Sequence, residues 1–228
     1  MDTSPALADP AVYLAPGRFI DSDHPRVAAF AARVAAGAPS REAAVKLYYA
    51  VRDEIIYDPY RVFDEEATYR ASDVLSARSG YCVGKAALLA AAARAAGIPS
   101  RISFADVRNH LATPRLLELT GGTDVFVYHG VTELWLGGRW VKATPTFNLS
   151  LCEKFHIRPL EFDGLADAIL HPYDRSGRQH MEYVRQRGTY ADVPVELVMT
   201  EMLTTYPALT PFAKKARGDF AKEAEELG

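Results

Sequence analysis

The first of the chain's two cysteines occupies a position suited to nucleophilic chemistry. Cys82 follows a Ser79–Gly80 turn signal and begins the alanine-rich run CVGKAALLAAAARAAG, which is typical of a helix. At a helix N-terminus, backbone N–H groups without intrahelical partners and the positive end of the helix dipole favour a thiolate over a thiol. The competing interpretation is structural, because free cysteine is among the most buried residue types.

A histidine on a predicted hairpin is the candidate base for this thiol. The segment DVFVYHGVTELWL (124–136) has the pattern of a strand, and Gly137–Gly138 predicts a two-residue turn into a second strand, RWVKATPTF (139–147). A lone histidine on a strand is more often structural. Next to Cys82, however, the imidazole of His129 would take the thiol proton, and the thiolate would attack a carbonyl carbon.

The two-residue turn also fixes the register of the hairpin. His129 then faces Thr146, and Thr144 is its diagonal neighbour. The face that carries His129 and Val131 is apolar, so we expect it to pack against the Cys82 helix. An aromatic pair and an opposite-charge pair support the register: Trp135 with Trp140 and Glu133 with Lys142.

The other elements must position this pair. The Cys82 helix is apolar nearly all round, which predicts a central helix packed on more than one side. Its only charged residues, Lys85 and Arg94, are expected to reach solvent or to pair with acids such as Glu118. Residues after 148 are loop-rich and end in a charged tail. Helices are predicted over 24–37, 40–57, 72–78, 82–96 and 192–207, and strands over 101–107, 124–136 and 139–147.

Composition restricts the class of protein. The chain has 228 residues, 49% of them apolar and 24% charged, as in ordinary globular proteins. A net charge of -3 leaves no basic footprint for nucleic acid, and no apolar run is long enough to cross a membrane. Two cysteines without a framework pattern and no secretory signal favour a reducing compartment. We therefore expect a cytoplasmic protein that binds neither nucleic acid nor membrane.

Two blocks of the sequence resemble the bacterial transglutaminase-like superfamily of papain-like cysteine enzymes. GYCVGKAALLAAAARAAGIPSR resembles its cysteine block, and YHGVTELWLGGRWVKATPTF resembles its histidine block. Matched blocks run from about residue 48 to 148. The resemblance implies an α+β papain-like core, with the Cys helix packed on an antiparallel sheet. It also implies a cofactor-independent Cys–His–Asp triad that forms a thioester with a peptide or protein amide and passes the acyl group to water or an amine.

The sequence departs from the family pattern at the third triad position. Where the family has Asp-Pro-Thr, this chain has Thr144 in KATPTFN. A threonine hydroxyl orients an imidazole but does not stabilise its cation as a carboxylate does. We assign the third role to Thr144, with Asn148 as its substitute, and Asp106 or Asp163 could also reach in from loops. A degraded site that only binds peptides is the alternative function.

Three further candidates are weighed against plainer interpretations. The backbone N–H of Cys82 can serve as an oxyanion donor, with Tyr81 as a second contributor or simply a packing residue. His110 could line the cleft, although a surface loop residue is the simpler interpretation. A zinc site is disfavoured, because the spacing of its potential ligands matches no tight pattern: Cys152, His156, His171, Asp174, His180 and Glu182.

The sequence therefore predicts a thiol-dependent amidase, peptidase or acyl transferase, with hydrolysis favoured over cross-linking. Cys82 is the nucleophile, His129 the base and then the acid, and no metal or cofactor is required. We expect an N-terminal arm over 1–23, a catalytic core over 24–150, and an extension over 151–228 that packs on or over the core. The oligomeric state is left open.

Overall fold

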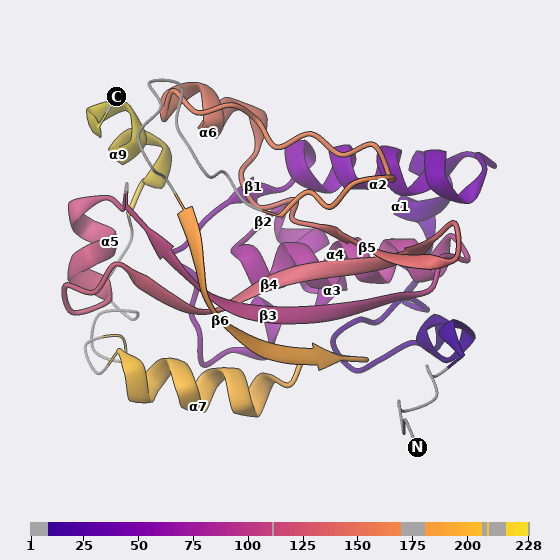
Figure 1. Ribbon diagram of the computed structural model, residues 1–228, viewed down its shortest axis with the longest axis horizontal. Helices are drawn as coiled ribbons and strands as arrows, with labels where there is room; N and C mark the ends of the chain where they lie inside the picture. Colours follow the sequence, from indigo (N-terminus) through magenta and orange to yellow (C-terminus); the bar gives the residue numbers. More distant parts are fainter. Residues whose placement is uncertain (1–8, 111, 170–180, 207–208, 210–217, 228) are drawn as a thin grey trace, which may run out of the picture.

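A computed structural model describes residues 9–110, 112–169, 181–206, 209 and 218–227. It is an α+β fold in which a helical layer covers one face of a four-stranded antiparallel sheet (Figure 1). The order of the strands is β5–β4–β3–β6, with bounds Arg139–Ala143, Val125–Leu136, Ser100–Asn109 and Met181–Tyr190. The predicted α+β, papain-like class, with the Cys-bearing helix on an antiparallel sheet, is confirmed.

The helical layer is built around α4 (Cys82–Ala95). This helix contacts β3 and β4 on one side and the three preceding helices on the other: α1 (Pro25–Ala35), α2 (Ser40–Glu54) and α3 (Ala71–Ala77). Every residue of α4 from Val83 to Arg94 is buried. The uninterrupted alanine and leucine surface is what allows neighbours on both sides, so the prediction of a central helix is confirmed.

The two charged residues of α4 neither reach solvent nor pair with an acid such as Glu118 in the described part of the chain, so this expectation from the sequence is wrong. Lys85 is fully buried, and its Nζ donates to the backbone oxygens of Arg52, at 2.9 Å, and Ile55, where α2 ends. Arg94 is also buried and donates to backbone oxygens, including that of Ser100 at 2.8 Å. Neither side chain reaches solvent, because main-chain carbonyls without helical or ladder partners supply the acceptors inside the fold.

The hairpin register is confirmed over its five ladder pairs, from Leu136–Arg139 to Thr132–Ala143. Gly137 and Gly138 both have positive φ, at 58° and 84°, as a type I′ turn requires. The second strand is shorter than predicted. It ends at Ala143 because the N–H of Thr144 donates to Ala168 O at 2.8 Å and Pro145 has no N–H to donate.

The face of β4 that packs on α4 is not the one we expected. Thr132 Oγ1 donates to Ala86 O at 2.9 Å, and a Cβ added at Gly130 would lie 2.9 Å from the Cα of Val83. Because side chains alternate along a strand, Val131 and Trp135 point away from α4. Close approach of helix and strand requires the glycine, not the large apolar side chains of the alternate face.

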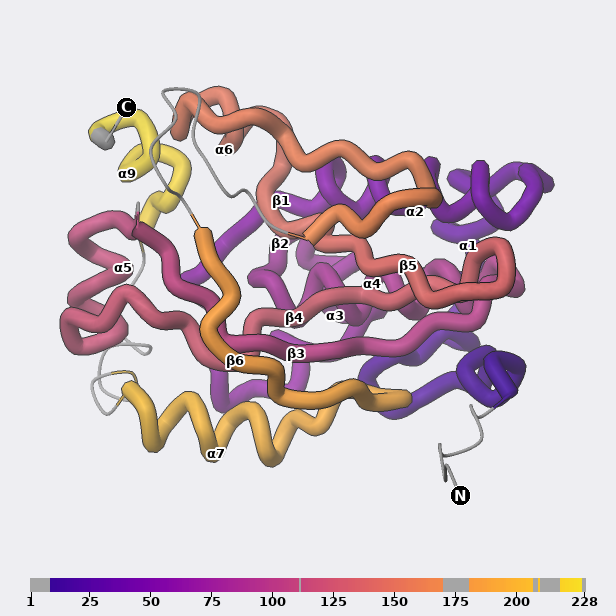
Figure 2. The backbone as a smooth tube through the Cα atoms, in the orientation of Figure 1, coloured from indigo at the N-terminus to yellow at the C-terminus, as the bar shows by residue number. Residues whose placement is uncertain are grey.

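The second half of the chain completes the sheet and adds helices around one end of it. β6 pairs with β3, and α7 (Val195–Thr205) packs against β4 along the lower edge in Figure 1. Figure 2 shows α9 (Phe220–Leu227) beside α6 (Leu149–Lys154), and the two helices are in contact. Among the described α-helices and the strands of this sheet, four were not predicted from the sequence: α5 (Pro114–Leu119), α6, β6 and α9.

The remaining elements are short. They comprise the 3₁₀ turns η1 (Pro10–Leu14) and η2 (Glu66–Thr68) and the parallel pair β1 (Ile56–Tyr57) and β2 (Ser79–Gly80), which precedes α4. The chain after η1 is bound by Asp192, whose carboxylate accepts the N–H of Arg18 at 2.7 Å and of Ile20 at 2.8 Å. Within the described residues, no helix has the length and apolar character needed to cross a membrane.

Candidate active site

Cys82 and His129 line one pocket, although they come from elements far apart in the sequence. The pocket lies where the N-terminus of α4 meets β4, and most of its wall is aromatic or aliphatic. Among the described residues that form it, none is an aspartate, glutamate, lysine or arginine. The structure thus brings the predicted nucleophile and the predicted base to the same place, in surroundings of low polarity.

Cys82 is the first residue of α4, with Tyr81 as its N-cap in an extended conformation. Burial raises the pKa of the Cys82 thiol to about 11, although hydrogen bonds from the backbone N–H groups of Gly130, Val83 and Cys82 itself lower it. At neutral pH the resting group is therefore a thiol. The three N–H groups around the sulphur are also donors that could stabilise negative charge developing beside it.

The early end of β5 explains how the pocket forms. β5 pairs with β4 only along Thr132–Leu136, so the preceding part of β4 has no β5 residue beside it. At this open edge the N–H of Gly130 reaches the Cys82 sulphur. Gly130 faces α4, and its neighbour His129 alternates to the other face of the strand and lines the pocket together with Cys82.

A β-bulge directly precedes His129. The ladder with β3 shifts between Ala105–His129 and Val107–Phe126, so two residues of β4 oppose Asp106. One of them, Tyr128, has a φ of 55°, in the left-handed region that is unfavourable for a bulky side chain. Bulges of this kind redirect side chains at functional sites. His129 itself is buried, with 6% of its surface exposed.

Asp106 supports this bulge. Its Oδ1 accepts the N–H of Tyr128 at 3.2 Å, and its carboxylate forms an ion pair with Arg187 at 2.9 Å. The guanidinium of Arg187 also lies 4.9 Å from the centre of the Tyr128 ring. Asp106 is absent from the lining of the pocket, and so is Asp163, which is exposed and accepts the N–H groups of Leu165 and Ala166.

Two threonines flank Pro145 near the predicted third position. The hydroxyls of Thr144 and Thr146 are both buried, and neither has a hydrogen-bond partner among the described residues. Thr146 lines the pocket together with His129, but Thr144 does not. Sequence reasoning did not assign a role to Thr146, although the predicted register placed it opposite His129. A buried hydroxyl without a partner calls for an explanation, and a substrate or imidazole contact is one.

Asn148 and Tyr81 differ in their relation to the pocket. The Asn148 amide is engaged elsewhere, since its oxygen accepts the N–H of Tyr57 at 3.1 Å and its nitrogen donates to Ser150 at 2.8 Å. Tyr81 lines the pocket, with its ring edge-on to Phe63 at 5.1 Å. Burial raises the pKa of Tyr81 well above its ordinary value, so its hydroxyl keeps its proton.

The other histidines do not reach the pocket in the described part of the chain. His110 lies 3.6 Å from Glu182 and does not line the pocket. No group of three or more His, Cys, Asp or Glu side chains suited to a metal ion occurs among the described residues. Of the zinc candidates, His171, Asp174 and His180 lie outside the residues that the structure describes.

Comparison with known proteins assigns the family. The sequence pattern of the transglutaminase-like superfamily matches residues 28–145, just over half of the chain. The chain belongs to this superfamily. Both Cys82 and His129 fall inside the match, as do all elements from α2 to β5. A comparison with curated proteins gives no match.

A solved structure described as a "Putative Cysteine Protease" from Cytophaga hutchinsonii is similar to this transglutaminase-like chain. The two share 17% sequence identity with a TM-score of 0.46, and the alignment covers 82% of this chain and 57% of that protein. This chain therefore spans a little more than half the length of that protein.

Several pocket residues lie beyond the superfamily match. Met202, Tyr206, Leu209 and Phe220 all contribute to the wall, from segments that the sequence did not assign to the site. Their apolar or aromatic character is visible in the sequence, but nothing local indicates that α7 and α9 approach α4. The second half of the chain is thus part of the pocket.

Proposed function

We propose that this transglutaminase-like protein is a thiol-dependent enzyme that acts on an amide or peptide carbonyl through Cys82 and His129. The observation that carries the proposal is their presence in one pocket, with three backbone N–H groups around the Cys82 sulphur. A nucleophile, a base and donors for the carbonyl oxygen are the minimum for acyl transfer.

Because the pKa of Cys82 is raised, we place the loss of its proton at the step in which the sulphur attacks the carbonyl. Because the resting group is a thiol, His129 must accept the proton as the sulphur attacks the carbonyl carbon, and the carbonyl electron pair moves onto oxygen. The N–H groups of Cys82, Val83 and Gly130 would bind that oxygen. Collapse of the tetrahedral intermediate breaks the C–N bond, while His129 returns the proton to the departing amine and a thioester forms.

The second half of the reaction releases the acyl group. His129 takes a proton from water, the resulting hydroxide attacks the thioester, and the thiolate leaves and regains the proton from His129. If an amine replaces water, the product is a new amide. Thr144 remains our candidate for orienting His129, and Thr146 joins it because its hydroxyl borders the pocket. Asn148 would have to give up its hydrogen bond from Tyr57 N–H to take this role.

A direct test uses an amide that releases 4-nitroaniline on cleavage, such as its hexanoyl derivative. We expect release by the parent protein, loss of release in Cys82→Ser, and an acyl group located on Cys82 by peptide mapping. Cys152→Ser is the matched control, because Cys152 is fully buried and lies outside the pocket. Equal rates for the parent and Cys82→Ser would refute the proposal.

The second candidate function is a binding module that has lost its chemistry. Two observations favour it: the pKa of the Cys82 thiol is raised, as in a packed cysteine, and threonine replaces the family's aspartate. In that case ligands would bind the pocket without any acyl group appearing on Cys82.

A further inference from the structure

We infer that the pocket selects substrates by an uncharged, apolar group next to the reacting amide, and that the second half of the chain creates this preference. The inference deepens the proposed function and rests on it for the identity of the reacting group. The inference rests on the composition of the pocket wall beside Cys82 and His129. Among the described residues, this wall includes no Asp, Glu, Lys or Arg side chain.

The pocket wall has two sources. Val107 on β3 and Phe126 on β4, which are paired in the sheet, supply the part that belongs to the superfamily core. Met202, Tyr206 and Phe220 supply a part that lies outside the match. This part of the wall, and with it the preference, therefore depends on residues outside the superfamily match.

Tyr206 is held rigidly in the wall. Its hydroxyl accepts the N–H of Val127 at 2.7 Å and donates to Val125 O at 2.8 Å. These are backbone groups of β4, so the hydroxyl takes the place of a neighbouring strand and turns the aromatic ring toward the pocket. Tyr206 follows directly after α7, and the helix brings Met202 to the same wall.

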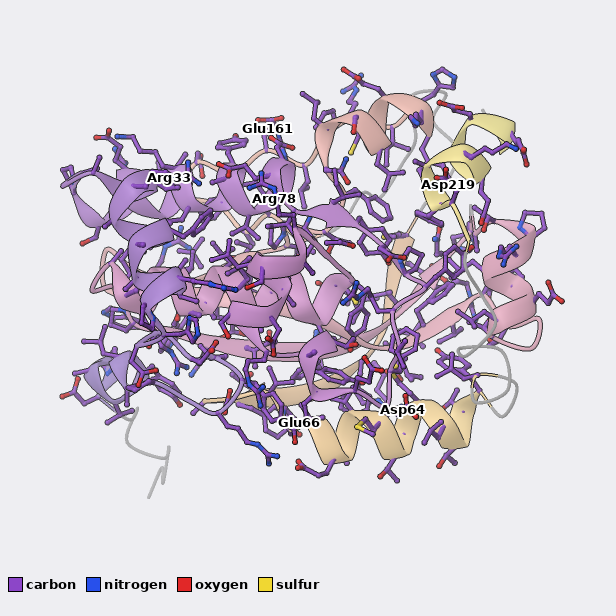
Figure 3. All side chains as sticks on the ribbon, turned by 180° about the vertical axis from the view of Figure 1, so that it is seen from behind. Arg33, Asp64, Glu66, Arg78, Glu161 and Asp219 are labelled. Atoms are coloured by element: carbon purple, nitrogen blue, oxygen red, sulfur yellow. The ribbon has the colours of Figure 1, made fainter. Side chains whose placement is uncertain are left out.

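The opposite part of the wall is fixed by α9. Phe220 packs edge-on against Tyr57, with 5.5 Å between ring centres. One turn further on, Glu223 accepts hydrogen bonds from Tyr60 at 2.5 Å and from Thr113 at 2.8 Å. Figure 3 shows Asp219 at the start of this helix, where its carboxylate accepts the N–H of Lys222. The hydrogen-bonding side chains of Asp219 and Glu223 thus lie outside the pocket lining, whereas Phe220 is part of it.

The chemistry of the bound group follows from this wall. An alkyl or aryl group gains free energy by leaving water for an apolar surface. A carboxylate or ammonium group of the same length would lose its hydration without meeting an opposite charge, so its binding is disfavoured. We therefore expect uncharged apolar groups to bind and charged ones to be rejected.

The test compares matched amides that differ only in charge. The probes are hexanamide and adipamate, which carries a carboxylate at the far end of a similar chain, titrated into Cys82→Ala by calorimetry. We expect hexanamide to bind at least about tenfold more tightly than adipamate. Equal affinities, or no detectable heat with hexanamide, would overturn the inference. N-pentylacetamide distinguishes an apolar group on the acyl side from one on the amine side.

A charge placed in the wall gives a second, independent test. Met202→Arg in the Cys82→Ala protein should reduce or reverse the preference, because the guanidinium would pair with adipamate. Leu203→Arg adds the same charge to the exposed side of α7 and should leave the preference unchanged. Equal responses of the two variants would contradict the assignment of this wall. If Met202→Arg does not fold, the comparison of probes on Cys82→Ala still decides.

Failure of the inference and failure of the proposed function are distinguishable. Selective binding of hexanamide without acylation of Cys82 in the parent would leave the pocket assignment intact and remove the catalytic role. Acylation of Cys82 without discrimination between the two amides would do the opposite.

Discussion

The Asp106 carboxylate accepts a hydrogen bond from the backbone N–H of Tyr128 at 3.2 Å, and so fixes the residue that precedes His129. In a Cys–His–Asp triad the carboxylate contacts the imidazole itself. Here Asp106 lies outside the pocket lining, bound to Arg187, and supports the bulge that turns His129. Asp106 thus contacts the backbone beside the proposed base and not its imidazole.

Asp106→Asn should therefore reduce catalysis through the position of His129. Breaking a buried ion pair costs about 3 kcal/mol, so unfolding in urea should show a loss of this order. Beyond that loss, we expect a lower maximal rate of acylation with little change in affinity for hexanamide. Glu201→Gln is the control, because Glu201 contacts the same Arg187 at 3.0 Å from a more exposed position. Full acylation activity in Asp106→Asn would show that the bulge does not depend on this contact.

The Cys82 thiol should react slowly with iodoacetamide at neutral pH. A pKa of about 11 against 9.0 for an ordinary cysteine leaves about a hundredfold less thiolate at pH 7. The alkylation rate, followed by peptide mapping to separate Cys82 from Cys152, should rise tenfold per pH unit through pH 9. An alkylation rate that is already independent of pH near pH 7 would instead show that Cys82 is a thiolate in the resting protein. This result would contradict the mechanism in which His129 removes the proton during attack.

Lys85 should make the stability of the protein depend on pH. Burial lowers its pKa from 10.5 to about 7, so the unfolded chain binds more protons than the folded one between these values. The folded state therefore gains stability as pH rises through this window, by about 3 kcal/mol from pH 7 to 9.5. The free energy of unfolding in urea should be measured for the parent and for Lys85→Met, and the difference between the two should increase by this amount over the same pH range. A difference that is independent of pH would mean that Lys85 keeps an ordinary pKa.

The two threonines beside Pro145 can be separated by valine substitutions. Neither hydroxyl has a partner among the described residues, so Thr144→Val and Thr146→Val should change the unfolding free energy by about 0.5 kcal/mol or less. If one of these hydroxyls orients His129 during the reaction, its valine variant should lower the acylation rate about tenfold and shift its pH profile. Parent rates in both variants would exclude a hydroxyl as the third group.

The helix and the hairpin were predictable because their signals are local. An apolar surface all around 82–96 requires a central helix, and a Gly-Gly turn with its flanking pairs fixes the register. The Cys–His pair was predictable from the same two blocks. The end of β5 has a local cause in Pro145, but its second cause is the bridge to Ala168, which no nearby residue signals.

Other features depend on contacts between distant segments. The bulge at Tyr128 requires Asp106 and Arg187, and a bulky residue with positive φ leaves no mark in the sequence. Lys85 was expected at the surface, because only the folded structure places the carbonyls at the end of α2 around its Nζ. β6 lacks an apolar alternation, since it is half-exposed at the sheet edge.

The most direct test of the account is the rate at which Cys82 is acylated by 4-nitrophenyl hexanoate in the parent and in His129→Ala. We predict a burst of one nitrophenolate per chain, an acyl group mapped to Cys82, and a burst slower by about a hundredfold or more in His129→Ala. Cys152→Ser should behave as the parent. Acylation of Cys82 at the same rate in both proteins, or no burst in the parent, would contradict a catalytic Cys82–His129 pair.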